Sequence, residues 1–226
     1  MDFWNSAHRI YVSDRHRDVH YARIAENFIA HVPRPDAVVL DWGCGDASAA
    51  PRIAAHCGRL LLVDAATATR ERLAERHRGS ETILVPAPEE LRPAWDGRVD
   101  LIVINSVLQY LTPEEADGLL AEAHALLAPG GRLVIADVIP PGDDIVADVG
   151  NLLGMALRHG FLLAAVAGLA ATFFSPYRQL RNTVGLSRYT EGTMLGKLIQ
   201  AGFTAERLTP NFGFDQRRMA FSARKS

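Results

Sequence analysis

Short apolar runs alternate with segments of helical periodicity between residues 36 and 140. Continuous apolar runs such as 101–104 and 133–136 are typical of parallel strands that helices cover on both faces. The alternation therefore predicts βαβ units and an α/β fold with a parallel sheet. The predicted strands are 38–41, 59–63, 82–85, 99–104 and 131–137, and the predicted helices are 47–56, 67–77 and 113–127. Pro129-Gly130-Gly131 is expected to form the tight turn into the fifth strand.

The flanking regions follow other patterns. Residues 1–35 are expected to form a helical cap, with a helix from about Asp14 that ends before Pro33. After Pro140-Pro141-Gly142 the rhythm breaks, and 143–186 is expected to be a helical insertion. Residues 187–226 return to the pattern, with Thr190 as N-cap, a helix over 191–200 and Gly202 as its stop. Two strands near 204–209 and 217–223 should then pair antiparallel at one edge of the sheet.

Composition narrows the class of partner. The 226 residues carry a formal net charge of -2, and arginine is spread along the chain instead of forming a basic run. Nucleic acid is therefore not expected as a partner, and a small molecule is favoured. The two cysteines lack a CxxC or metal-ligand pattern, and the N-terminus lacks the apolar stretch of a signal peptide. These features predict a single domain in a reducing, cytoplasmic compartment.

A glycine turn follows the first predicted strand. In Asp41-Trp42-Gly43-Cys44-Gly45 the glycines allow a sharp turn and a close approach to a ligand, as expected where a strand breaks into a nucleotide-binding turn. Asp64 ends the second strand, nineteen positions beyond Gly45, where a carboxylate can accept bonds from two ribose hydroxyls. The alternative is that Asp64 only caps a helix that begins near Ala66.

Five segments in order resemble the successive motifs of class I S-adenosylmethionine-dependent methyltransferases. They are Leu40–Gly45, Val63-Asp64, Asp100–Asn105, Leu127–Val134 and Gln200–Phe203. The resemblance covers about 36–140 and 187–226, and 105–110 is similar to the corresponding segment of small-molecule methyltransferases. It implies a Rossmann-like doubly wound sheet, mostly parallel with an antiparallel C-terminal strand, and S-adenosylmethionine as cofactor with S-adenosylhomocysteine as product.

The resemblance also implies roles for individual residues. Asp41 would orient the glycine turn near the methionine ammonium, Asp64 would hold the ribose hydroxyls, and Asn105 would line the methionine side. Ala87 stands where family members often carry an acid for the adenine amino group, so Glu89 or a backbone carbonyl would substitute. The implied cofactor contacts are Asp41, Gly43, Cys44, Gly45, Asp64, Ala65, Glu89, Asn105, Ser106, Gln109 and Tyr21.

Methyl transfer from a sulfonium needs alignment more than catalytic groups. A hydroxyl or carbon acceptor would need a base, for which His20 and His16 are the candidates, with Tyr21 and Tyr110 as polar positioners. A carboxylate or amine acceptor would need none. His16 and His20 have metal-ligand spacing, but no third ligand accompanies them, so no metal is expected. A helix that closes over the cofactor with solvated histidines is the alternative to catalysis.

The predicted insertion leaves three interpretations open. Its segment 161–174 carries no charge, and 158–181 includes flanking arginines. It could be a lid that selects a hydrophobic or lipid-like acceptor, an element in peripheral contact with a membrane, or a dimer interface or buried helix pair. At the level of function, the alternatives to a methyltransferase are an NAD(P)-dependent oxidoreductase and a non-catalytic cofactor-binding scaffold.

Overall fold

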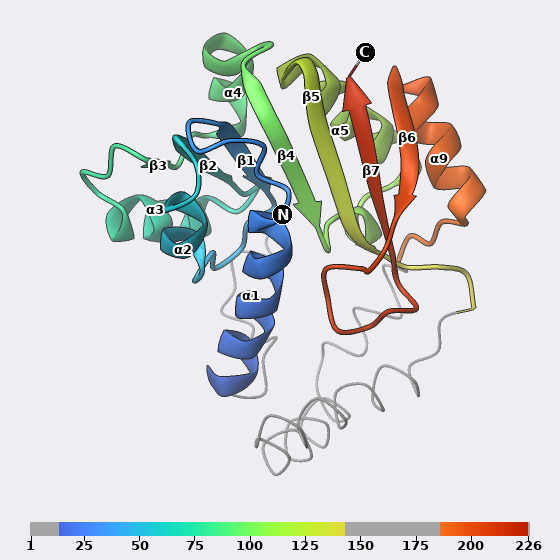
Figure 1. Cartoon of the computed structure of the whole chain (residues 1–226), viewed down its shortest axis with the longest axis horizontal. Coiled ribbons are helices and arrows are strands. Elements are labelled where there is room, and N and C mark those ends of the chain that lie inside the picture. The colour runs from blue at the N-terminus through green and yellow to red at the C-terminus, as the bar shows by residue number, and fades with distance from the viewer. Residues whose placement is uncertain (1–13, 143–185, 226) are drawn as a thin grey trace.

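The computed structural model describes residues 14–142 and 186–225, which form a seven-stranded sheet with helices on both faces (Figure 1). The strands are β1 (Val38–Trp42), β2 (Arg59–Val63), β3 (Ile83–Leu84), β4 (Val99–Asn105), β5 (Leu127–Val138), β6 (Phe203–Leu208) and β7 (Met219–Lys225). The helices are α1 (Asp14–Ile29), α2 (Ala50–Ala54), α3 (Thr67–Arg76), α4 (Pro88–Trp95), α5 (Pro113–Leu126) and α9 (Glu191–Gln200), with a 3₁₀ turn, η1, at Leu108–Tyr110.

The strand order is β3-β2-β1-β4-β5-β7-β6. The first five strands in this order are parallel, and β7 pairs antiparallel with both β5 and β6. From β1 the chain winds outward through β2 to β3 and then crosses back to β4, so the topological switch point lies between β1 and β4. Ligands of doubly wound sheets bind outside the carboxyl ends of the strands at this point.

Two apolar cores fill the space between the sheet and its helices. One joins alternate strand residues to side chains of α1, α2 and α3, among them Phe28, Ile53 and Leu73. The other joins the remaining strand residues to α4, α5 and α9, through Leu91, Leu120 and Leu198 among others. In Figure 1, α1 lies at the lower left, beyond the ends of β1 and β4, whereas α5 lies behind β5 and β7 and α9 lies beside β6. The predicted doubly wound architecture with an antiparallel C-terminal strand is confirmed.

The prediction for the fifth strand placed its start too late. Instead of a turn that precedes the strand, Pro129-Gly130-Gly131 lies within β5, which already begins at Leu127. Val99 and Leu101 of β4 pair with Leu127 and Arg132, so three extra residues bulge out of β5. Gly130 has φ +73, and a Cβ on Gly131 would lie 2.8 Å from the Ala128 carbonyl oxygen. Glycine therefore permits a bulge where the sequence suggested a turn.

Helix α4 was not predicted between the third and fourth strands, because two prolines interrupt its short sequence. Pro88 occupies the first turn, where no helical N–H is required, and Glu90 Oε2 accepts a bond from Ala87 N at 2.8 Å. Farther along the chain, the prediction of Thr190 as N-cap is confirmed by the Thr193 N bond to its hydroxyl at 3.1 Å. Most of the predicted insertion lies outside the described residues, and no helix in the described part is long and apolar enough to span a membrane.

Candidate functional site

The glycine turn sits at the switch point and is held by the end of β2. Gly43 N and Cys44 N donate to the Val63 carbonyl oxygen at 2.7 and 3.1 Å, and Gly45 N donates to Asp64 Oδ2 at 3.0 Å. Gly43 has φ +76, and a Cβ there would lie 2.4 Å from Val107 Cγ2. A side chain is therefore excluded by backbone conformation and by the segment that follows β4.

Asp64 links the turn to helix α3. Its Oδ1 accepts from Ala66 N at 2.9 Å, while Oδ2 receives the Gly45 bond. The N-cap of α3 is Ala66, so Asp64 supports the start of that helix without being its N-cap. The two roles weighed from the sequence are thus compatible, because backbone donors orient both oxygens and leave lone pairs for further donors.

Asp41 lies at the end of β1 close to a second acid. Burial, together with the charge of Asp64, raises its pKa from 3.8 to about 7. The contacts that hold the glycine turn come from Val63 and Asp64, whereas Asp41 was predicted to orient it. Burial also raises the pKa of the neighbouring Cys44 thiol, which is inert at neutral pH. Two acidic side chains therefore lie together at the switch point, where doubly wound sheets form their ligand crevice, and the thiol beside them is not a nucleophile at neutral pH.

Helix α1 brings Tyr21 to the glycine turn. The Tyr21 hydroxyl accepts from Asp46 N at 3.3 Å and lies 3.5 Å from the position of a Cβ on Gly45. His20 packs edge-to-face on Tyr21 with ring centroids 5.9 Å apart, and burial lowers its pKa to about 4. His20 is therefore neutral at about pH 7. His16 lies on α1, but its side chain is outside the described part.

The remaining predicted residues lie at or after the end of β4, after β2, or on α4. Asn105 ends β4, Ser106 follows it, and η1 carries Gln109, which is buried, and Tyr110, which is 40% exposed. Ala65 lies next to Asp64, and Arg70 Nη1 donates to its carbonyl oxygen at 2.9 Å. Glu89 is exposed at the start of α4 and lines a groove along that helix with Pro93 and Trp95. Among the described residues, no three side chains form a group that could hold a metal ion.

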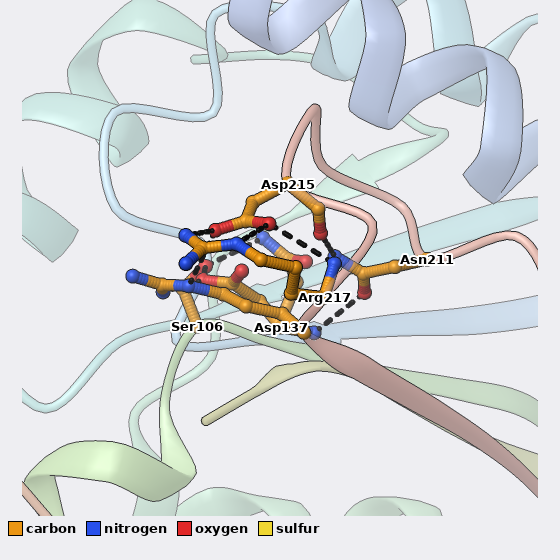
Figure 2. Close-up of polar contacts among 7 residues, drawn as sticks. Ser106, Asp137, Asn211, Asp215 and Arg217 are labelled. Carbon is orange, nitrogen blue, oxygen red and sulfur yellow. Dashed lines mark hydrogen bonds and ion pairs between the residues drawn. The ribbon is translucent and has the colours of Figure 1, made fainter. Parts of the chain in front are cut away.

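A polar cluster at the carboxyl ends of β4 and β5 was not predicted (Figure 2). Ser106 Oγ donates to Asp137 Oδ2 at 2.7 Å, and Arg218 Nη1 donates to the same oxygen at 2.9 Å. Asp137 N donates to Asn211 Oδ1 at 3.0 Å. Burial raises the pKa of Asp137, whereas Arg218 and the Ser106 bond oppose that shift.

The cluster holds strained backbone in place. Ser106 and Asp137 have φ +58 and +63, in the left-handed region that costs about 1–2 kcal/mol for an L-residue. The loop before β7 is fixed against them by Asn211, whose amide nitrogen donates to the Asp215 carbonyl oxygen at 3.1 Å, and by the Asp215–Arg217 ion pair. Two strained residues bonded to one another at the carboxyl ends of adjacent strands indicate a functional constraint.

One signal in the sequence pointed to Asp137. It is a polar residue at the end of a parallel strand, which is also the position that singled out Asn105. The partners Asn211 and Arg218 had no comparable signal, since they lie more than seventy residues further along the chain. Their placement depends on β7 pairing with β5.

Comparison with known proteins identifies the family of this chain. Residues 40–135 match a family model described as a methyltransferase domain. A curated relative, the carboxy-S-adenosyl-L-methionine synthase of Salmonella arizonae, is 31% identical over 190 residues, which cover 80% of this chain and 71% of that protein. The chain belongs to the class I S-adenosylmethionine-dependent methyltransferases. Its cofactor is S-adenosylmethionine, and the matches favour this family over an NAD(P)-dependent oxidoreductase.

Solved structures share the fold of this methyltransferase. The 1,6-didemethyltoxoflavin-N1-methyltransferase of Burkholderia thailandensis, solved with bound 1,6-didemethyltoxoflavin and S-adenosylhomocysteine, is 22% identical with a TM-score of 0.55, covering 91% of this chain and 78% of that chain. A geranyl diphosphate methyltransferase, solved with GPP and sinefungin, is 16% identical with a TM-score of 0.58, covering 91% of this chain and 77% of that chain. At these identities the likeness establishes the fold.

Proposed function

We propose that this methyltransferase acts on a small, hydrophobic or lipid-like acceptor by in-line displacement. The observation that carries the proposal is the acidic crevice at the switch point, where Asp64 ties β2 to the glycine turn beside Asp41. When bound, S-adenosylmethionine supplies an electrophilic methyl group on a sulfonium. The protein supplies alignment and exclusion of water.

The crevice suits a cationic cofactor. Two acids share it, and their repulsion contributes to the raised pKa of Asp41, so a positively charged ligand would relieve that repulsion. Asp64 retains lone pairs for ribose hydroxyls, and its bond from Gly45 N holds the glycine turn beside it. We place the remaining cofactor contacts on Cys44, Ala65, Glu89, Asn105, Ser106, Gln109 and Tyr21.

Helix α1 and η1 supply the polar groups on the acceptor side. His20, with Tyr110 as a positioner, remains the candidate base among the described side chains, and His16 is the second candidate by sequence. A pKa of about 4 makes His20 a weak proton acceptor in the free enzyme. This favours an acceptor, such as a carboxylate or an amine, that needs no dedicated base.

The hydrophobic character of the acceptor is proposed from the uncharged segment 161–174. The two ends of the region that contains this segment meet at the acceptor side of the sheet. Tyr189 N donates to the Ile139 carbonyl oxygen at 3.0 Å, and Ser187 N donates to the Gln109 carbonyl oxygen at 2.9 Å. Ser187 thus lies beside η1, next to the proposed acceptor position, and Tyr189 lies beside the residue that follows β5.

A mass-shift screen tests the proposal. The protein is incubated with isotopically labelled S-adenosylmethionine and with separate polar-metabolite and lipid extracts. We expect one labelled methyl group to appear on a component of the lipid or apolar fraction, and none with Asp64→Ala. Methylation confined to polar metabolites would overturn the acceptor class, and cofactor binding without turnover on any fraction would favour the non-catalytic scaffold.

A further inference from the structure

Three hydrogen bonds connect Arg218 to Asn105 through the polar cluster. Arg218 Nη1 donates to Asp137 Oδ2 at 2.9 Å, and Ser106 Oγ lies 2.7 Å from the same oxygen. Asn105 Nδ2 lies 3.1 Å from Ser106 Oγ. Figure 2 shows Ser106 and Asp137 in the lower part of this cluster, with Asp215 above them and Asn211 to the right.

These three hydrogen bonds can run in only one direction. A guanidinium has no acceptor, so Asp137 Oδ2 accepts from Arg218 and carries no proton. The Ser106 hydroxyl must then donate to that oxygen, which leaves its own oxygen to accept from the Asn105 amide. The NH₂ group of Asn105 therefore faces Ser106, and its carbonyl oxygen, Oδ1, faces away.

Asn105 Oδ1 is buried and has no hydrogen-bond partner within the described ranges. An unsatisfied buried acceptor is costly unless a ligand supplies the donor. Asn105 directly follows Ile104, which pairs with Trp42 of β1, so it lies at the switch point beside the glycine turn. The donor it lacks would therefore come from a group bound in the acidic crevice.

We propose that Asp137 is a positioning residue, which through Ser106 fixes the Asn105 amide so that Oδ1 accepts from the α-ammonium of the cofactor's methionine. The inference rests on the proposed placement of the cofactor. An ammonium matches both the free carbonyl oxygen and the nearby Asp41. The left-handed backbone of Ser106 and Asp137 places both side chains for this chain of bonds.

The test compares two ligands that differ only at the α-ammonium. Calorimetry gives the Kd of S-adenosylhomocysteine and of its deamino analogue for each variant. In the wild type we expect S-adenosylhomocysteine to bind about tenfold more tightly than the analogue. This ratio should fall toward one in Asn105→Ala, Asp137→Ala and Ser106→Ala. Each of these changes either interrupts the series of hydrogen bonds or removes the amide at its end.

Two further variants separate positioning from general damage. Asp137→Asn keeps an acceptor for the Ser106 hydroxyl and tolerates the left-handed backbone, so it should restore most of the ratio. Asp215→Asn alters another carboxylate of the same cluster, which pairs with Arg217 and lies 3.9 Å from Arg218 Nε but bonds to neither Ser106 nor Asn105, and it should also keep the ratio.

The outcomes separate the positioning role of Asp137 from the proposed cofactor site. A wild-type ratio in Asp137→Ala and Ser106→Ala overturns the positioning role while the cofactor site stands. A wild type that binds neither ligand overturns the cofactor site and the inference with it. If circular dichroism shows that Asp137→Ala does not fold, Ser106→Ala decides whether the positioning role holds. That variant interrupts the series of hydrogen bonds but leaves the bond between Arg218 and Asp137 in place.

Discussion

We expect Asp41 to couple the protonation of the protein to the binding of its cofactor. Its pKa is raised from 3.8 to about 7 in the folded chain, so between these values the native state binds one more proton than the unfolded state. The stability that this proton provides is present below about pH 4 and is lost as the pH rises through about 7. A cation bound beside Asp41 favours the ionised form, so binding below about pH 7 must release the proton.

The affinity for S-adenosylhomocysteine should therefore depend on pH. We expect its Kd to rise roughly five- to tenfold when the pH falls from about 7.5 to about 6. Calorimetry across this range measures the change. Asp41→Asn is the control and should show a much flatter profile, because the pKa of His20, at about 4, lies below the window. Equal pH profiles in wild type and variant would contradict the assignment.

Gly43 tests the packing of the glycine turn. Gly43→Ala should lower the free energy of unfolding by about 1–3 kcal/mol, because the new Cβ would lie 2.4 Å from Val107 Cγ2 and the backbone has φ +76. Urea denaturation measures the loss. Gly118→Ala, on the exposed side of α5 with no atom within 4 Å of its Cβ, should instead stabilise by roughly 0.5–1 kcal/mol. A neutral Gly43→Ala would show that the turn can shift at no cost.

At the level of elements, the sequence predicted what local periodicity controls. Buried runs such as 101–104 are typical of strands between two helix layers, and Thr190 and Gly202 marked the ends of one helix. Helix α4 and the bulge in β5 escaped prediction because prolines and glycines obscure the periodicity there. The Asp137 cluster could not be foreseen in full, because its partners meet only through pairing between distant strands.

One strand pair carries an unfavourable contact that can be measured. Arg132 of β5 and Arg224 of β7 are directly opposite one another. Burial, together with the facing Arg224 charge, lowers the pKa of Arg132. Like charges at opposed positions destabilise a sheet, so removing one of them should stabilise the protein.

Arg224→Gln should raise the free energy of unfolding by about 0.2–1 kcal/mol at low ionic strength. Urea denaturation with and without about 0.5 M salt measures the effect, which should shrink as salt screens the repulsion. Arg224→Lys keeps the charge and should change little. Arg224→Gln removes the charge and Arg224→Lys keeps it. An equal rise in the free energy of unfolding in both variants would therefore attribute the effect to side-chain packing instead of charge repulsion.

For the whole molecule, cofactor and acceptor sites are expected to be separable. The proposed cofactor residues lie on the sheet and its first helices, whereas the acceptor region is proposed to include the sequence between Ile139 and Tyr189, two residues that are bonded to one another. Deleting 155–180 should preserve binding of S-adenosylhomocysteine within about threefold and abolish methylation of the acceptor. Calorimetry and the labelled-methyl assay measure the two separately. General unfolding, or loss of cofactor binding, would favour a structural or dimer-forming role for the segment.

The position of β7 between β5 and β6 also constrains the order of assembly. Strand β6 precedes β7 in the chain, yet it joins the sheet only through β7. Residues 203–208 therefore cannot become part of the sheet until 219–225 have paired with β5. Until that late step, the outer side of β5 remains an open edge of unpaired N–H and C=O groups. In a newly synthesised chain, we expect β5 to be the strand that pairs most readily with a second copy of the protein. The risk lasts until β7 of the same chain has paired with β5.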